Sequence, residues 1–276
     1  MIASKAWIEF GLTIAACQKL MRDRTRLCRA ACDPGLCEIE ANRMSDLLER
    51  FAVSPKQAAK GGAGVVFDVL REEIISLSLA PGTMLSRQEL QERFGFSSTP
   101  IRDALMRLQE ERLVDIFPQH ATVVSAIDLD LARQGQFLRR SVELELVRSL
   151  ALAPQPALLG KMKSLIRQQT AFADLGEHEA FAAADHAFHR SLYDAAQMTV
   201  LWDLVRRQSG HIDRLRHLHL PKEGKMREIL AAHAAIVDAI EASDPVRAQD
   251  ALRDHLSRSL DFVPALRDLH PTYFKK

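Results

Sequence analysis

Apolar positions recur at helical spacing along most of the chain. Between residues 65 and 79 they return every three or four positions, and the Ala-Pro-Gly sequence at 80–82 ends the run. Ser86, with Glu89 three positions later, predicts a capping box at the start of a second helix, which Gly95 ends. This part of the chain therefore predicts two consecutive helices joined by a short connection.

A third helix and the extended segments follow at once. Thr99 is suited to cap the helix N-terminus, and Pro100 is suited to its first turn. The pattern then becomes extended over 113–117 and 122–126, on either side of a turn at 118–121. Helix, helix, tight turn, helix and hairpin is the order of a winged helix-turn-helix domain, whose third helix enters the major groove of DNA.

Beyond Asp128 no strand pattern returns, and breaker residues separate a series of helical runs. Such a series predicts a bundle of six to seven helices, in which sites are built from inward-facing side chains. The expected fold class is therefore mainly α, with a winged helix-turn-helix domain followed by an all-α helical bundle. The predicted runs are 129–153, 156–175, 177–196, 198–219, 223–242 and 245–260.

The N-terminal residues differ from the rest of the chain. All four cysteines precede Met44, and we interpret residues 1–43 as either an extension or a start-site artefact with Met44 as initiator. A cysteine metal site and a lipoprotein-type signal are the less favoured alternatives. Glycines before Val65 predict a flexible lead-in. The predicted organisation is an extension at 1–64, a winged helix-turn-helix domain at 65–127, a helical domain at 128–263 and a tail at 264–276.

Composition limits the class of protein. The chain has 276 residues, of which 47% are hydrophobic and 26% charged, and this is ample for a packed core. No run of about 18 uncharged apolar residues occurs, so we expect a cytoplasmic protein without a transmembrane helix. The net charge is +1, and residues 65–127 carry six arginines against nine acidic side chains. Charge alone therefore does not establish DNA binding, and a scaffold in which Arg102 pairs with a nearby acid is an alternative.

The start of the third predicted helix carries side chains suited to DNA. Hydroxyl groups at Ser97, Ser98 and Thr99 can contact phosphates or base edges, and the guanidinium of Arg102 can bind guanine. Backbone N–H groups at this helix end can also bind a phosphate. The full set of candidate DNA-binding residues is Arg87, Ser97, Ser98, Thr99, Arg102, Arg107 and His120.

Three histidines and an aspartate stand out in the helical domain. Asp185 and His189 are four positions apart and share a helix face, while His233 and His255 each lie on an apolar face of a later helix. Imidazole and carboxylate ligands suit a divalent first-row metal and leave coordination positions open for water or a ligand. The alternative is that these histidines are ordinary core or interface residues.

The sequence LSRQELQERFGFSSTPIRDALMRLQEERLVDIFPQHATVV resembles the N-terminal domain of GntR-type bacterial transcription regulators. It is similar to their pattern of a helix ending in glycine, then Ser-x-Thr-Pro-Val-Arg-Glu-Ala-Leu, then a wing. The resemblance implies that Arg102 is the recognition arginine and that Thr99 and Ser97 contact phosphate and bases.

The chain departs from this family pattern at three positions. Ser98 and Gln88 stand where the family usually has arginine, and Ala121, preceded by His120, replaces the wing glycine. Arg87, one residue away from Gln88, is the candidate substitute. The departures imply an operator affinity or preference that differs from the family norm.

Residues 128–260 resemble the FCD effector domain of the FadR subfamily of these regulators. The segments DHAFHRSLYDAAQ, AAHAAIVDAI and ALRDHL carry the match. The resemblance implies that Asp185, His189, His233 and His255 bind one divalent metal per chain. Zinc is the favoured ion, and nickel and manganese are the alternatives.

Two arginines are candidates for holding an effector. A guanidinium can bind a carboxylate through two hydrogen bonds, which favours Arg139 and Arg214. An i,i+4 pair with Glu143 is the alternative role for Arg139. Ala232 replaces a glutamate of the family pattern and is not expected to be a ligand.

The resulting hypothesis is a DNA-binding transcription regulator without enzymatic activity, whose operator affinity is modulated by a small carboxylate metabolite at the metal site. Its expected partners are a near-palindromic double-stranded DNA operator, a small organic acid effector and a second copy of the chain in a homodimer. The alternatives are a metal-dependent hydrolase on a helical bundle and a metal-free ligand-sensing regulator.

Overall fold

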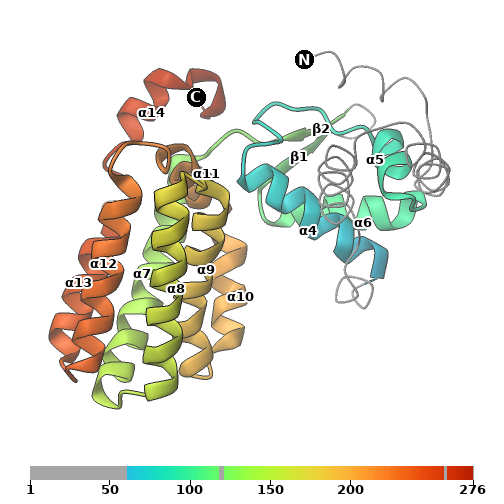
Figure 1. The fold of residues 1–276 in the computed structure, drawn as a ribbon. Coiled ribbons are helices and arrows are strands. Elements are labelled where there is room, and N and C mark those ends of the chain that lie inside the picture. Colours follow the sequence, from blue (N-terminus) through green and yellow to red (C-terminus); the bar gives the residue numbers. More distant parts are fainter. Residues whose placement is uncertain (1–60, 118–120, 258–259, 276) are drawn as a thin grey trace, which may run out of the picture. The chain divides into compact units, whose positions relative to one another are not determined.

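Figure 1 shows the computed structural model of the chain, which describes residues 61–117, 121–257 and 260–275. His120 and the interpretation of residues 1–43 lie outside the described residues. The predicted mainly α fold class is confirmed, because helices dominate these ranges and a single two-stranded sheet occurs in them. None of the helices in these ranges combines the length and the apolar composition that crossing a membrane requires.

The winged helix-turn-helix domain contains three helices and a hairpin in the predicted order. Its elements are α4 (Gly61–Ile75), α5 (Arg87–Phe94), α6 (Ser98–Glu110), β1 (Val114–Phe117) and β2 (Ala121–Val124). The strands pair antiparallel, with Val114 opposite Val124. α4 packs against α6 over a buried apolar core that includes Val66, Leu70, Ile74, Ile101, Leu105 and Leu108.

α4 begins earlier than the sequence predicts, at Gly61 instead of near Val65. Gly64 is buried, and a Cβ at Gly62 would lie 3.0 Å from the ring of Phe96. Packing against neighbouring side chains therefore outweighs the low helix propensity of glycine at these positions. The predicted flexible lead-in is wrong for this stretch.

The ends of α5 follow the sequence prediction, and the start of α6 does not. The hydroxyl of Ser86 accepts a hydrogen bond from the N–H of Glu89 at 3.3 Å, and Gly95 ends α5 in the left-handed conformation, with φ of 69°. The N-cap position of α6 is Ser97, two residues before the predicted Thr99. Thr99 therefore lies inside the first turn of the helix.

The helical domain follows the predicted runs closely, except that the run at 198–219 is divided between Gln208 and Gly210. α14 (Val263–Leu269) begins at the last residue of the predicted helical domain and continues into the predicted tail, which also contains a short 3-10 helix (Pro271–Tyr273). The other helices are α7 (Leu129–Leu152), α8 (Pro156–Leu175), α9 (His178–Ala195), α10 (Thr199–Gln208), α11 (Gly210–His219), α12 (Lys225–Glu241) and α13 (Pro245–Ser257).

The helices α7, α8, α9, α12 and α13 form the main bundle of this domain (Figure 1). Its core contains Leu146, Leu150, Met162, Phe188, Leu192, Ile236 and Ile240. Polar side chains are buried in the same bundle, among them Arg139, Glu143, Gln169, Asp185, His189 and His233. Because burying charged groups is costly unless they are paired, this concentration marks the candidate site.

Gly135 allows α7 to approach α10 closely. A Cβ at this position would overlap the backbone carbonyl oxygen of Gln208. We predict that Gly135→Ala lowers the free energy of unfolding by about 1–3 kcal/mol, because the helices must shift to relieve the overlap. Urea titration followed by circular dichroism measures the change.

Gly160→Ala on α8 is the matched control. A Cβ at this exposed helical position meets no atom within 4 Å. Alanine should therefore raise the free energy of unfolding there by about 0.5–1 kcal/mol through its better helix propensity. If both substitutions change stability in the same direction, the close approach at Gly135 is contradicted.

Candidate functional site

The N-terminus of α6 presents three hydroxyl side chains to solvent. Ser97, Ser98 and Thr99 are all exposed. Among the described residues, no side chain caps this helix end and no acidic residue lies in its first turn. The first N–H groups of a helix lack intrahelical acceptors and carry a partial positive charge, so this end can bind a phosphate.

Arg102 lies in the following turn of α6 with its guanidinium in solvent. Its side chain is 61% exposed, and its Nη2 lies 3.4 Å from Oδ1 of Asp103, a weak contact at the surface. Arg87 and Arg107 are also exposed, but Arg107 packs over the ring of Phe67, with 4.0 Å between the guanidinium carbon and the ring centroid. Arg102 and Arg87 therefore have the more available guanidinium groups.

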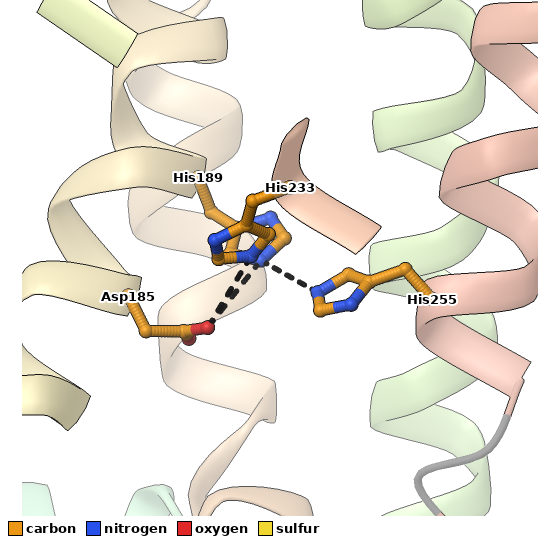
Figure 2. Close-up of side chains that lie close together, drawn as sticks. All are labelled: Asp185, His189, His233 and His255. Atoms are coloured by element: carbon orange, nitrogen blue, oxygen red, sulfur yellow. Dashed lines mark hydrogen bonds and ion pairs between the residues drawn. The ribbon is translucent and has the colours of Figure 1, made fainter. Parts of the chain in front are cut away.

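Asp185, His189, His233 and His255 come together from three helices. Asp185 and His189 lie on α9, His233 on α12 and His255 on α13. The four side chains point toward one another (Figure 2), and one ligand atom from each lies within 4.8 Å of the others. The Nε2 atoms of His189 and His255 are 3.2 Å apart, and Oδ1 of Asp185 is 3.5 Å from Nε2 of His233. This group can hold a metal ion.

Hydrogen bonds behind the group orient two of its imidazole rings. Nδ1 of His189 donates to Oε2 of Glu143 at 2.8 Å, and Nδ1 of His233 donates to Oε1 of Gln169 at 2.9 Å. With Nδ1 protonated, a neutral ring presents the lone pair of Nε2, which is the tautomer that a metal ligand requires. Glu143 and Gln169 therefore orient His189 and His233 toward the centre of the group.

Two atoms of the group are buried without a hydrogen-bond partner in the described part of the chain, namely Oδ1 of Asp185 and Nε2 of His233. An unpaired buried polar atom costs about 1–3 kcal/mol. A divalent ion at the centre would satisfy both atoms. One carboxylate with three imidazoles is a donor set that suits zinc, nickel or manganese.

Burial and neighbouring charges set the protonation states of two of the candidate ligands, His233 and Asp185. Burial lowers the pKa of His233 to about 3, so its ring is neutral near pH 7. Burial raises the pKa of Asp185, but Arg216 and the nearby histidines outweigh it and hold that pKa well below its usual range. Nη2 of Arg216 donates to Oδ2 of Asp185 at 2.5 Å. Asp185 is therefore ionised, and its other oxygen faces the group.

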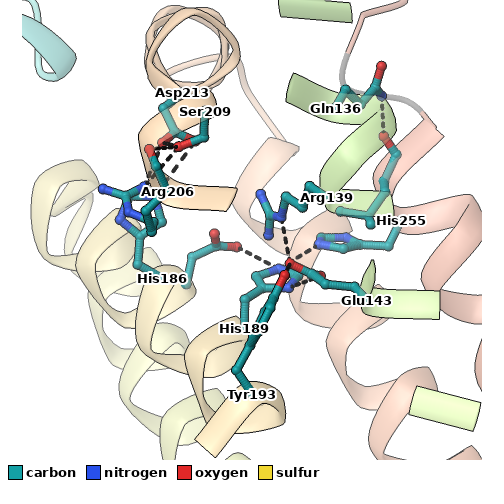
Figure 3. Close-up of polar contacts among 12 residues, drawn as sticks. Gln136, Arg139, Glu143, His186, His189, Tyr193, Arg206, Ser209, Asp213 and His255 are labelled. Atoms are coloured by element: carbon teal, nitrogen blue, oxygen red, sulfur yellow. Dashed lines mark hydrogen bonds and ion pairs between the residues drawn. The ribbon is translucent and has the colours of Figure 1, made fainter. Parts of the chain in front are cut away.

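Arg139 and Glu143 form a buried ion pair beside the group (Figure 3). Nε of Arg139 donates to Oε1 of Glu143 at 2.8 Å, and the two side chains are 8% and 0% exposed. The hydroxyl of Tyr193 donates to the same oxygen at 3.4 Å. The i,i+4 pair considered for Arg139 is therefore present, and it involves the carboxylate that orients His189.

A cavity of about 780 Å³ lies beside the group. Asp185, His255 and Arg216 are in its wall, and Arg139 is not. A ligand in the cavity can therefore reach the candidate metal centre and the guanidinium of Arg216 together.

Arg214 does not line the cavity. It is fully buried, and its Nη1 donates to the backbone oxygen of Ser125 at 2.7 Å. Side chains two positions apart on a helix point in directions about 200° apart around the helix axis. Arg214 and Arg216 therefore face opposite sides of α11. The sequence prediction selected Arg214 and missed Arg216, and only the rotation of α11 in the folded domain distinguishes them.

Two family profiles match the chain. Residues 63–124 match the profile described as bacterial regulatory proteins of the gntR family, and residues 136–258 match the FCD domain. An HTH-type transcriptional regulator in an unstable DNA locus of Streptomyces ambofaciens is 35% identical over 206 residues, which cover 74% of this chain and 86% of that protein. The HTH-type transcriptional repressor RspR of Escherichia coli K12 is 26% identical over 211 residues, which cover 76% of this chain and 92% of RspR.

Solved structures agree with the fold. E. coli McbR/YncC has a TM-score of 0.66 at 20% identity and covers 75% of this chain and 98% of its own. A putative transcriptional regulator GntR from Rhodococcus sp. RHA1 has a TM-score of 0.61 at 21% identity, and the match covers 74% of this chain and 98% of that protein. At these identities the likeness supports the fold alone.

The buried pair of Arg139 and Glu143 leads to a stability prediction. Glu143→Gln keeps the side-chain volume but leaves the charge of Arg139 buried without its carboxylate. We expect the free energy of unfolding to fall by about 3 kcal/mol, as for other broken buried ion pairs. Chemical denaturation measures the loss.

Glu145→Gln provides the control two positions along α7. Glu145 pairs with Arg148 at the surface, where solvent screens the interaction. We expect little change in the denaturation midpoint for this variant. Equal effects of the two substitutions would contradict the assignment of Glu143 as a buried structural carboxylate.

Proposed function

Because the chain belongs to the GntR family of bacterial transcription regulators and carries an FCD domain, we propose that a small organic acid bound at its metal centre controls its affinity for operator DNA. The chain is a DNA-binding regulator and not an enzyme. The observation that carries the proposal for the sensing site is the convergence of four metal-ligand atoms beside a cavity that also contains Arg216.

The proposed DNA contacts lie on α6 and at the start of α5. Arg102 contacts a base edge in the major groove, and the hydroxyls of Ser97, Ser98 and Thr99 contact phosphates or bases. Arg87 binds a phosphate nearby. Arg107 and His120 remain proposed contacts, and the packing of Arg107 on Phe67 makes it the less available of the arginines.

A homodimer would present two copies of α6 to a near-palindromic operator. Exposed apolar side chains on α10 support association of two chains. Val200 and Leu204 are four positions apart on one face of this helix, and they are 75% and 41% exposed.

The proposed metal ligands are Asp185, His189, His233 and His255, with zinc favoured and nickel and manganese as alternatives. When bound, such an ion supplies a Lewis acid that can accept a carboxylate oxygen of the effector. Arg216 would donate hydrogen bonds to the second carboxylate oxygen of the effector. The buried positive charge of Arg139, on the far side of the four ligands, would attract the negatively charged effector electrostatically. An effector that binds one arrangement of the domains more tightly than another shifts the population toward that arrangement and so changes the affinity for DNA. The coupling free energy between effector binding and DNA binding is typically about 1–3 kcal/mol.

The DNA contact of Arg102 is directly testable. An operator selected from random DNA sequences should bind Arg102→Ala more weakly than the unchanged protein by about 1–3 kcal/mol, because a guanidinium-to-base contact is lost. Fluorescence anisotropy with labelled operator measures the affinity. Arg133→Ala is the control, since Arg133 is an exposed arginine of the helical domain. Unchanged operator affinity for Arg102→Ala would exclude it as the recognition residue.

The metal centre is testable by elemental analysis of protein without a histidine tag. We expect about one divalent ion per chain, and a clearly lower occupancy in His233→Ala, because that variant lacks one of the four proposed ligand atoms. Gln169→Ala should weaken metal binding about 10–100-fold, as for other residues that orient a ligand. His217→Ala is the control, because His217 lines the cavity but lies outside the ligand group. Full occupancy in His233→Ala would refute the site.

A further inference from the structure

The cavity beside the metal centre has a wall of alanine side chains. Ala232 and Ala235 lie on α12, Ala182 lies on α9, and Ala251 lies on α13. All four line the cavity and are partly exposed. An alanine side chain ends at Cβ, so these residues, here called the alanine wall, present methyl groups and leave the space beyond them open.

The alanine wall begins one helical turn from the metal ligands. Ala182 precedes Asp185 by three positions, and Ala251 precedes His255 by four, so each shares a helix face with a ligand. Oδ1 of Asp185 belongs to the ligand group and is buried with no hydrogen-bond partner in the described part of the chain, which independently indicates that something binds at this end of the cavity. A molecule whose carboxylate reaches the metal centre therefore places the rest of its body beside alanine methyl groups.

Larger apolar side chains continue this surface, namely Phe181, Leu220, Ile229 and Phe262. The ring of Phe262 stacks on the imidazole of His219, with 3.4 Å between the ring centroids. Both ring nitrogens of His219 are buried, and neither has a hydrogen-bond partner within the described ranges. The stacked rings of His219 and Phe262 therefore add flat ring surface to the cavity wall.

Five of the charged side chains that the helical domain contributes to the cavity are engaged in ion pairs, and Glu179 and Asp254 line the cavity as well. A ligand hydroxyl placed against the alanine wall would exchange its hydrogen bonds with water for contact with methyl groups, and that exchange is unfavourable. A hydrocarbon group would lose nothing and would bury apolar surface. The engaged pairs are Arg216 with Asp185, Asp213 with Arg206, and Lys225 with Glu228.

We propose that the effector is a monocarboxylic acid with a hydrocarbon body, in preference to a polyhydroxylated acid. Its carboxylate binds at the metal centre near Arg216, and its hydrocarbon body packs on the alanine wall. This inference rests on the proposed function, because it assigns the chemical class of the effector for the same site.

Isothermal titration calorimetry of the full chain loaded with zinc tests the proposal. The ligands are acetate, butanoate, hexanoate and gluconate, and gluconate has the carbon chain of hexanoate with hydroxyl groups added. We expect affinity to increase about fourfold for each added methylene, which is ~0.8 kcal/mol of apolar burial. We also expect hexanoate to bind more tightly than gluconate.

Substitutions in the alanine wall connect the ligand preference to these residues. Ala235→Leu and Ala232→Leu fill the space in front of α12, so each should reduce hexanoate affinity roughly tenfold or more while acetate affinity changes by less than about twofold. Ala234→Leu is the control on the same helix, because Ala234 does not line the cavity. It should leave the affinity for both acids unchanged.

The outcomes separate this inference from the proposed function on which it rests. If acetate binds but affinity does not increase with chain length, or if gluconate binds more tightly than hexanoate, the inference is wrong and the metal-centred sensing site stands. If none of the acids binds to zinc-loaded protein, both the sensing site and the inference fail. Equal loss of acetate and hexanoate in the leucine variants would place the hydrocarbon body elsewhere.

Discussion

The stability of the helical domain depends on pairing the negative charge of one buried carboxylate. Glu143 is fully buried on α7, and burial alone would raise its pKa, but Arg139 and His189 outweigh burial and lower that pKa to about 2. The ionised carboxylate then accepts hydrogen bonds from Arg139 and from His189. Because His189 belongs to α9, the need to pair this charge ties α7 to the helix that carries two of the proposed metal ligands.

Similar buried contacts orient three of the four proposed ligand side chains before any ion binds. The ring of His189 is held from behind by Glu143, the ring of His233 by Gln169, and one oxygen of Asp185 by Arg216. Each of these contacts leaves one donor atom directed at the centre of the group. The ordering of the side chains is thus provided by folding, so binding an ion requires little further loss of side-chain freedom.

Much of this organisation could be predicted from the sequence, because helical periodicity and the four-residue spacing of Asp185 and His189 are local properties. The proximity of His233 and His255 was predicted only through the resemblance to a family. Arg216 was missed because its direction depends on how α11 is rotated against α9, which local spacing does not specify. The early start of α4 was missed for a similar reason, since contacts with Phe96 outweigh the propensity of its glycines.

The ligand group has a consequence for the stability of the fold. His189 and His255 are separated by 66 positions in the chain, yet their Nε2 atoms are 3.2 Å apart. An ion bound between them would act as a cross-link that closes a long loop and restricts the unfolded chain. The melting temperature of the domain would then depend on the concentration of free metal, with the greatest stability when metal is abundant. Depletion of the ion in a cell would loosen the bundle itself, and the abundance of the protein would follow metal supply.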